Sequence, residues 1–199
     1  MASPERVGCS RKELPMNAKD EKASLLAERQ APLRRAYVED PERARTVKWA
    51  ATANSAETDA LHSVVHIGSG YGVSQRTGID RAIGGDHDLP NPGDLLCSAL
   101  AACKDGTIRM IAALLGIPIL DLKVEVTGDV DVRGCLAMDR AVKVGFRSMS
   151  CSVHLRVPAD IEAKRIATLQ KQAERSCVNL DTLRSGVPVD LVFNVERAP

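Results

Sequence analysis

Residues 91–118 read NPGDLLCSALAACKDGTIRMIAALLGIP, and this long apolar stretch constrains the arrangement of everything around it. Asn91 is a suitable N-cap, Pro92 fits the first turn of a helix, and Asp94 lies near the positive end of the helix dipole. Gly116 suits the C′ position, and the proline two residues later prevents the helix from continuing. The sequence therefore predicts one uninterrupted helix across this stretch.

The predicted helix, residues 93–115, carries apolar side chains on nearly every face, which is typical of a helix buried at the centre of a domain. At about 1.5 Å per residue it would be roughly 35 Å long. The longest apolar run, 110–120, has 11 residues. Because a membrane-spanning helix needs about 20 apolar residues, we expect a domain core and no membrane partner.

The segments that flank this helix alternate between apolar and polar residues, as strands do. Residues 45–53 and 61–67 predict a hairpin around the turn 54–60, and residues 70–75 can add a third strand. A loop rich in Gly, Asp and Pro then leads to the central helix.

After the central helix the sequence predicts two long strands, an amphipathic helix, a short turn and a last strand. Antiparallel strand pairs around two helices define an α+β fold and exclude a doubly wound α/β fold. The expected elements are strands 119–132 and 147–157, helix 159–176, turn 178–185 and strand 187–195.

The N-terminal region differs from the rest in composition. Residues 1–16 are polar and expected to be disordered, and residues 17–30 have helical composition up to Pro32, with a second short helix over 33–38. We expect residues 1–40 to form an N-terminal extension, partly disordered and then a helical arm. Residues 41–199 would form the folded domain.

The overall composition excludes several classes of function. The 199 residues include 27 Lys plus Arg and 26 Asp plus Glu, which gives a formal net charge of +1. Aromatic residues make up 3% of the chain, too few for the stacking platforms of single-strand binders. We therefore expect no nucleic-acid partner. The charged N-terminus is not a secretory signal, which predicts a cytoplasmic protein.

The chain contains six cysteines and no CxxC pair or other zinc-ligand spacing. In a reducing compartment a disulfide framework is not the default, and unpaired cysteines are among the most buried residue types. On position alone each is a small core residue. The six are Cys9, Cys97, Cys103, Cys135, Cys151 and Cys177.

Two of these cysteines lie in motifs that resemble the OsmC/Ohr family of thiol peroxidases. Residues 91–105, NPGDLLCSALAACKD, are similar to the family signature NPE-x-L-x-A-A-x-x-A-C, and residues 173–183, AERSCVNLDTL, are similar to its second-cysteine motif. The resemblance extends over about residues 45–197 in the same order of elements. It implies an OsmC-like α+β fold in which antiparallel sheets wrap two central helices of an intertwined homodimer.

The resemblance also implies a chemistry. Cys103 would be the peroxidatic thiolate and Cys177 the resolving cysteine, in a cycle that reduces an organic hydroperoxide during oxidative stress and is reset by an external dithiol. No cofactor and no metal are implied. An apolar pocket lined by residues such as Leu96, Leu100 and Met110 would favour alkyl hydroperoxides over hydrogen peroxide.

Cys97 cannot replace Cys177 as the partner of Cys103. Six helical residues separate it from Cys103 by about 9 Å of rise, whereas a disulfide requires Cα atoms within about 7 Å. Cys97, Cys135, Cys151 and Cys9 are interpreted as structural or incidental.

The sequence departs from the family pattern at two positions. Gly93 stands where organic hydroperoxide reductases of the family have a Glu that holds an Arg against the reactive sulfur, and the turn 54–60, where that Arg belongs, has none. Asp94 is the neighbouring carboxylate and is considered a supporting residue. The cations that could substitute for the missing Arg are Arg34, Arg35, Arg76, Arg81, Lys104 and Arg109.

Two alternatives to the peroxidase remain open. A divergent OsmC-like protein could bind a small hydrophobic ligand or sense oxidants without catalysis. A metal held by Cys103 and His87 is a further possibility, although a solvated loop histidine before a helix needs no ligand to explain it.

Overall fold

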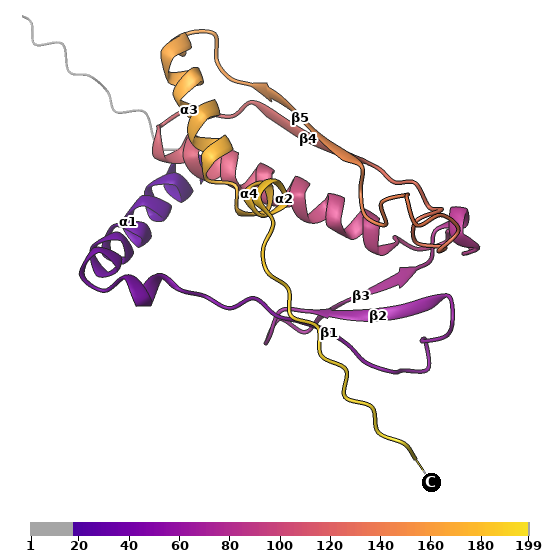
Figure 1. Ribbon diagram of the computed structural model, residues 1–199. Coiled ribbons are helices and arrows are strands. Elements are labelled where there is room, and N and C mark those ends of the chain that lie inside the picture. Colours follow the sequence, from indigo (N-terminus) through magenta and orange to yellow (C-terminus); the bar gives the residue numbers. More distant parts are fainter. Residues whose placement is uncertain (1–17, 199) are drawn as a thin grey trace, which may run out of the picture.

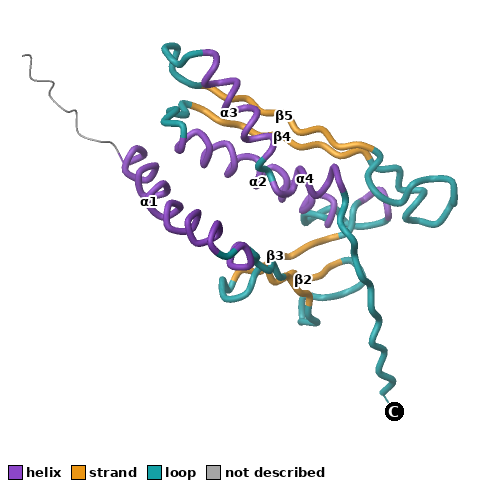
Figure 2. The backbone as a smooth tube through the Cα atoms, turned by 60° about the vertical axis from the view of Figure 1, so that its left-hand side comes forward, coloured by secondary structure: helices purple, strands orange, loops and turns teal. Residues whose placement is uncertain are grey.

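The computed structural model describes residues 18–198, and α2 (Pro92–Leu114) runs through its middle (Figure 1). A two-stranded hairpin lies along one side of α2, and a three-stranded sheet lies on the opposite side (Figures 1 and 2). The other helices are α1 (Ala18–Glu39), α3 (Ala163–Arg175) and α4 (Val178–Ser185), with short 3-10 helices at Pro41–Ala44 and Arg81–Ile83.

Both sheets are antiparallel, so the predicted α+β class is confirmed. The first contains β1 (Ala50–Thr52), β2 (His62–Ile67) and β3 (Val73–Gly78) in that order. In the second, β4 (Asp121–Asp129) pairs with β5 (Ser148–Arg156) along its whole length. The strands of the first sheet are shorter than predicted at β1 and begin later at β3.

The ends of α2 follow the local signals in the sequence. The Asn91 side chain accepts a hydrogen bond from the Asp94 N–H, and the Asp94 carboxylate accepts one from the Asn91 N–H, each at 3.0 Å. This capping box satisfies two backbone donors of the first turn. At the other end Gly116 has φ +61°, a conformation that glycine adopts without strain, and the helix ends as predicted.

The core lies where the C-terminal half of α2 meets α3. Leu169 of α3 is 1% exposed and packs with Ile111, Ala112 and Ile117. Partly buried side chains from β5 and the adjoining loops, including Leu155 and Val157, surround this cluster. The core therefore joins both helices to the β4–β5 hairpin.

The expectation that α2 is buried on nearly every face is wrong for the single chain. Leu96 is 39% exposed, and Ala99, Ala102 and Gly106 are also exposed on this side of the helix. The described elements that pack on α2, among them β4, α3 and α4, leave this side uncovered. α2 thus carries more apolar side chains than a single chain buries.

The N-terminal arm is one helix and not two short ones. Pro32 lies inside α1, where it removes one backbone donor but does not break the helix, because strong helix formers flank it. The helix packs against α2, with Leu26, Gln30 and Ala36 half-buried. The predicted disordered segment 1–16 and Cys9 lie outside the described residues.

The C-terminal region differs from the prediction in two ways. Residues 178–185 form the helix α4 and not a turn, because the Asp181 N–H donates to the Cys177 carbonyl and begins a helical ladder. Residues 187–195 form no strand, because no described strand edge pairs with them. This tail runs away from the body of the chain (Figure 1), with Val189 and Phe193 82% and 80% exposed.

The core predicts a stability effect. Leu169→Ala should lower the free energy of unfolding by about 3 kcal/mol, because it removes buried methyl groups and leaves a cavity between α2 and α3. Urea denaturation followed by far-UV circular dichroism measures this change. Leu136→Ala is the matched control at a 47% exposed leucine and should cost less than about 1 kcal/mol; equal losses would contradict this account of the core.

Candidate functional site

Cys103 lies near the middle of α2 and is half-buried. The Thr107 hydroxyl donates to the Cys103 carbonyl oxygen at 2.7 Å, so the local backbone is held by a side chain of the next turn. The position on a long, well-capped helix gives the Cys103 thiol a rigid support.

Cys177 lies at the junction of α3 and α4 and is 0% exposed. Its backbone is extended and occupies the N-cap position of α4. Its thiol donates to the Cys103 sulfur with 3.5 Å between the two Sγ atoms. The structure thus brings together two cysteines that are 74 residues apart in the sequence.

Burial raises the pKa of the Cys177 thiol, and this is the largest influence on it. The neighbouring Cys103 acts in the same direction, whereas the Leu180 N–H in the first turn of α4 and the Lys104 ammonium lower the pKa. The net rise keeps Cys177 protonated at neutral pH, which fits its role as the donor to the Cys103 sulfur.

Lys104 reaches the same junction although it follows Cys103 directly and points to another side of the helix. Its side chain is buried, and Nζ donates to the Ala173 carbonyl oxygen in the last turn of α3 at 3.1 Å. Lys104 is one of the six cations that could substitute for the Arg that the resemblance implies in the first hairpin turn. It is the one among them that influences the Cys177 thiol.

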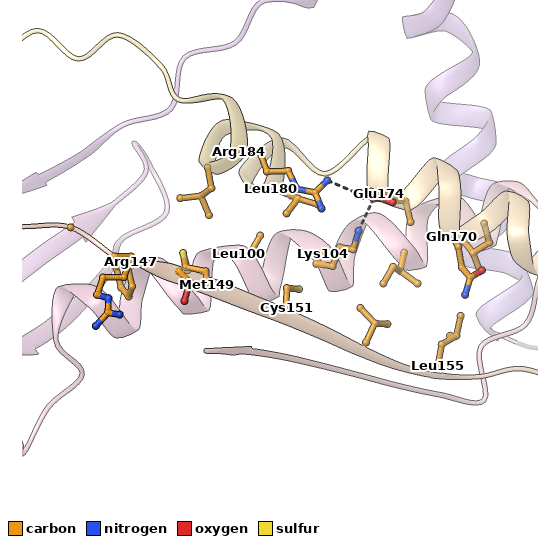
Figure 3. A pocket seen from close by; sticks show the side chains of 18 of the residues that line it. Leu100, Lys104, Arg147, Met149, Cys151, Leu155, Gln170, Glu174, Leu180 and Arg184 are labelled. Atoms are coloured by element: carbon orange, nitrogen blue, oxygen red, sulfur yellow. Dashed lines mark hydrogen bonds and ion pairs between the residues drawn. The ribbon is translucent and has the colours of Figure 1, made fainter. Parts of the chain in front are cut away.

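A groove runs beside this junction, between α2, β5, α3 and α4 (Figure 3). We call it the α2 groove; its volume is about 790 Å³. Leu100 and Lys104, which flank Cys103 on the helix, line it, but neither sulfur of the pair does. Its apolar walls include Leu100, Ile108, Met149, Val153, Leu155, Leu169, Leu180 and Leu183.

The predicted lining of the pocket is only partly correct. Leu100 lines the α2 groove, whereas Leu96 faces away from it and Met110 packs against the core. Sequence reasoning also missed Cys151, which lines the groove from β5. Every second residue of this strand, Met149, Cys151 and Val153, points to the same face of the hairpin, and this alternation could have placed the Cys151 side chain on the inner face.

An aromatic ring, that of Phe146, lies beside Gly93, the position at which the resemblance implies a Glu. A Cβ at Gly93 would lie 3.4 Å from Phe146 Cζ, and a Cβ at Gly128 would overlap the same ring. Gly128 on β4 therefore makes room for the Phe146 ring, whereas a Cβ at Gly93 would be in ordinary contact with the ring and nearer to Asn91 Oδ1, at 2.9 Å. Asp94, the expected supporting residue, is engaged in the capping box and lies nine residues, roughly 14 Å of helix, before Cys103.

The other candidate cations are engaged elsewhere or exposed. Arg76 pairs with Glu57 at 3.6 Å, and Arg109 pairs with Asp105 at 2.7 Å. Arg34 bonds to Gln30 within α1, and Arg35 and Arg81 are exposed.

The remaining described cysteines lie away from the pair. Burial, with Asp94 as a smaller influence, raises the pKa of Cys97. The exposed Cys135 thiol donates to the Val132 carbonyl oxygen at 3.1 Å. His87 approaches Asp80 at 3.9 Å. Within residues 18–198 no group of three or more His, Cys, Asp and Glu side chains could hold a metal ion.

The turn of the first hairpin holds an acid and not an Arg. The Asp59 carboxylate accepts hydrogen bonds from the Leu61 and His62 N–H groups at 2.7 and 2.8 Å, and it contacts the His62 ring at 3.0 Å. On its other side the ring lies 3.3 Å from Asp88. The pKa of His62 is raised, first by Asp59 and then by Asp88. This cluster fastens the turn to the loop that precedes α2.

Comparisons with known proteins place this geometry in a family. The sequence model of the OsmC-like proteins matches residues 85–192. A search of curated proteins gave no match. In the described part of the chain, no helix is both long and apolar enough to cross a membrane.

Solved structures with the same fold include three bacterial proteins. An OsmC-like protein from Mycoplasma pneumoniae is 15% identical, with 71% of this chain and 89% of that chain covered and a TM-score of 0.56. The organic hydroperoxide resistance protein OsmC from Legionella pneumophila is 17% identical (70% and 90% covered, TM-score 0.51). An organic hydroperoxide resistance protein from Elizabethkingia anophelis is 16% identical (71% and 91%, TM-score 0.50). At these identities the likeness shows the fold alone.

The His62 cluster predicts a pH-dependent contribution to stability. Because the pKa of His62 is raised in the folded state, its ion pairs stabilise the fold fully below the ordinary pKa of about 6.5 and lose effect as the pH rises through the raised value. His62→Gln should therefore lower the melting temperature more at pH 5.5 than at pH 8.5. Differential scanning calorimetry at both pH values measures this. A difference in melting temperature between the wild type and His62→Gln that is constant or grows with pH would contradict the stabilising role of protonated His62.

Proposed function

The chain belongs to the OsmC-like protein family, and from the two thiols that its fold brings into contact we propose that it reduces organic hydroperoxides. The observation that carries the proposal is the 3.5 Å contact between the Cys103 and Cys177 sulfurs. A half-buried thiol beside a fully buried one suits an attacking and a resolving cysteine. The names of the Legionella and Elizabethkingia proteins point to the same substrate class.

The proposed cycle has three steps. The Cys103 thiolate attacks one oxygen of the peroxide, an S–O bond forms, the O–O bond breaks, and an alcohol leaves after protonation. Cys103 is thereby oxidised to a sulfenic acid. The Cys177 sulfur then attacks the Cys103 sulfur, the S–O bond breaks, and the Cys177 proton leaves with the hydroxyl group as water. An external dithiol finally reduces the disulfide and is itself oxidised.

The α2 groove supports an organic substrate. Its walls are mainly apolar, and it is bordered by Leu100 and Lys104 on either side of Cys103. An alkyl or aryl group that enters the groove would be removed from water next to the turn of α2 that carries Cys103. Hydrogen peroxide has no such group and would gain nothing there. The reducing cytoplasm that we propose for the protein would supply the external dithiol.

We also propose that the protein is a homodimer. Val187, Val189, Leu191, Phe193 and Val195 alternate along an extended tail and are each more than half exposed. This period-two pattern is that of a strand with one buried face. An apolar strand face and the apolar exposed side of α2 are large surfaces to leave in water. A second copy of the chain would cover both.

A second candidate function is the binding of a small hydrophobic ligand without catalysis. The observation that favours it is Phe146, which packs on Gly93 where the family has its Glu, while Arg76 pairs with Glu57. Without the Arg–Glu pair, the Cys103 thiol would lack the activation found in the peroxidases of the family. The α2 groove would then be the ligand site.

The reaction with cumene hydroperoxide separates these two functions. One equivalent added to the fully reduced protein should give a Cys103–Cys177 disulfide within minutes, as read by peptide mass spectrometry. Cys103→Ser should slow peroxide consumption by about 10³-fold or more, because it removes the nucleophile. Cys177→Ser should leave a sulfenic acid on Cys103 that dimedone traps.

Cys135→Ser is the matched control, because this exposed cysteine lies outside both the thiol pair and the α2 groove, and it should keep the activity. If the wild-type protein and Cys103→Ser consume the peroxide equally slowly, the peroxidase proposal is wrong. The ligand-binding function would then be the better account of the site.

The homodimer has its own test. The wild-type protein should sediment at twice the mass of the chain in analytical ultracentrifugation. Leu191→Asp with Phe193→Asp should shift it toward the monomer, because two charges would enter the covered strand face. Met138→Asp places a charge at a 70% exposed residue of another loop and should leave the dimer intact. A wild-type monomer would refute the proposal.

A further inference from the structure

The junction of α3 with α4 depends on a charged side chain from α2. The last carbonyl groups of α3 have no partner within the helix, because the chain turns away at Ser176 and is extended at Cys177. One of these carbonyls, at Ala173, accepts a hydrogen bond from the Lys104 ammonium. A cation at the C-terminal end of a helix also interacts favourably with the helix dipole.

The charges around Lys104 do not cancel. Glu174 is the only acid among the described residues that line the α2 groove, and it already pairs with Arg184 at 2.8 Å. Glu174 pairs with Arg184 (Figure 3), whereas the Lys104 ammonium donates to a backbone carbonyl, so positive charge is in excess at the groove. The other cations of the groove, Lys143 and Arg147, are exposed at its rim.

The Lys104 ammonium is held one helical turn before the resolving thiol. Cys177 follows Ala173 by one helical turn, so the carbonyl that Lys104 holds belongs to the turn that delivers the Cys177 thiol to Cys103. The Lys104 ammonium lowers the pKa of Cys177 against the larger effect of burial. A buried ammonium is stabilised by nearby anions, and a Cys177 thiolate would be a second anion beside the Glu174 carboxylate.

We infer that Lys104 is a positioning residue of the dithiol pair, whose ammonium fixes the end of α3 on α2 and favours the thiolate of Cys177 for its attack on oxidised Cys103. The part of the inference that concerns the attack on oxidised Cys103 rests on the proposed peroxidase function. In this inference the positive charge of the site acts on the resolving cysteine, Cys177. The charge comes from the residue after Cys103 and not from an Arg in the first hairpin.

The first experiment measures the thiolate of Cys177 without any peroxide. The absorbance at 240 nm is titrated from pH 6 to 10.5 in Cys103→Ser and in Cys103→Ser with Cys177→Ser, and the difference reports Cys177. Adding Lys104→Met should move this titration upward by roughly one pH unit. Lys104→Arg, which keeps the charge, should move it less. An unchanged midpoint in Lys104→Met would overturn the inference.

The second experiment follows the resolving step by rapid mixing with cumene hydroperoxide and mass spectrometry. At pH 7, Lys104→Met should close the disulfide about tenfold more slowly, with sulfenic acid accumulating, whereas formation of the sulfenic acid keeps its rate. The difference in closure rate between Lys104→Met and the wild type should become smaller as the pH rises toward 10, because the Cys177 thiolate then forms without the nearby ammonium. Lys171→Gln, at an exposed lysine of α3 outside the groove, should behave as the wild type.

A purely structural role gives a different pattern. Lys104→Met and Lys104→Arg would then slow the closure equally at every pH, which would overturn the inference even if both variants fold. Failure of the peroxidase function itself is recognised separately, because the wild-type protein would form no disulfide with the peroxide. The thiolate titration would still decide whether Lys104 acts on Cys177.

Discussion

The antiparallel contact between α2 and α3 is the constraint on which the thiol pair depends. Each helix supplies a cation to the C-terminal end of the other: Arg165 donates to the Leu115 and Gly116 carbonyl oxygens, and Lys104 donates to that of Ala173. The buried Leu169 packs between these two points. Because both ends are held, the register of α3 on α2 is fixed. Cys177, one turn beyond Ala173, reaches Cys103 only in this register.

Much of the fold could be predicted from the sequence where the signals are local. The capping box at Asn91, the left-handed Gly116 and the alternation of β4 and β5 act within a few residues, and the structure contains the elements that they predict. The errors lie where distant contacts decide. A short segment such as α4 becomes a helix because Leu180 and Leu183 pack into the groove. The tail 187–195 has the pattern of a strand but pairs with none of the strands among residues 18–198.

The site was predictable in part and only through resemblance. Position alone gave six equivalent small core residues, and the two motifs singled out Cys103 and Cys177. The role of Lys104 is not visible in the sequence. Adjacent residues of a helix point about 100° apart, so the side chain of Lys104 leaves α2 in a different direction from that of Cys103. It meets α3 only because the two helices pack together. Phe146 is equally hidden. Its ring, 53 residues after Gly93 in the sequence, can lie beside Gly93 because β4 carries Gly128 on the other side of the ring.

These two features together change how the charge is distributed around the thiols. The N-terminal part of α2, where the family holds its Arg–Glu pair, is packed with an aromatic ring and capped by Asp94. The remaining buried cation lies on the far side of Cys103, at the end of α3. This ammonium lowers the pKa of the buried Cys177 thiol against the larger effect of burial. The departures of this chain from the pattern that the resemblance implies therefore concern the charges around the thiols, whereas the two sulfurs lie 3.5 Å apart.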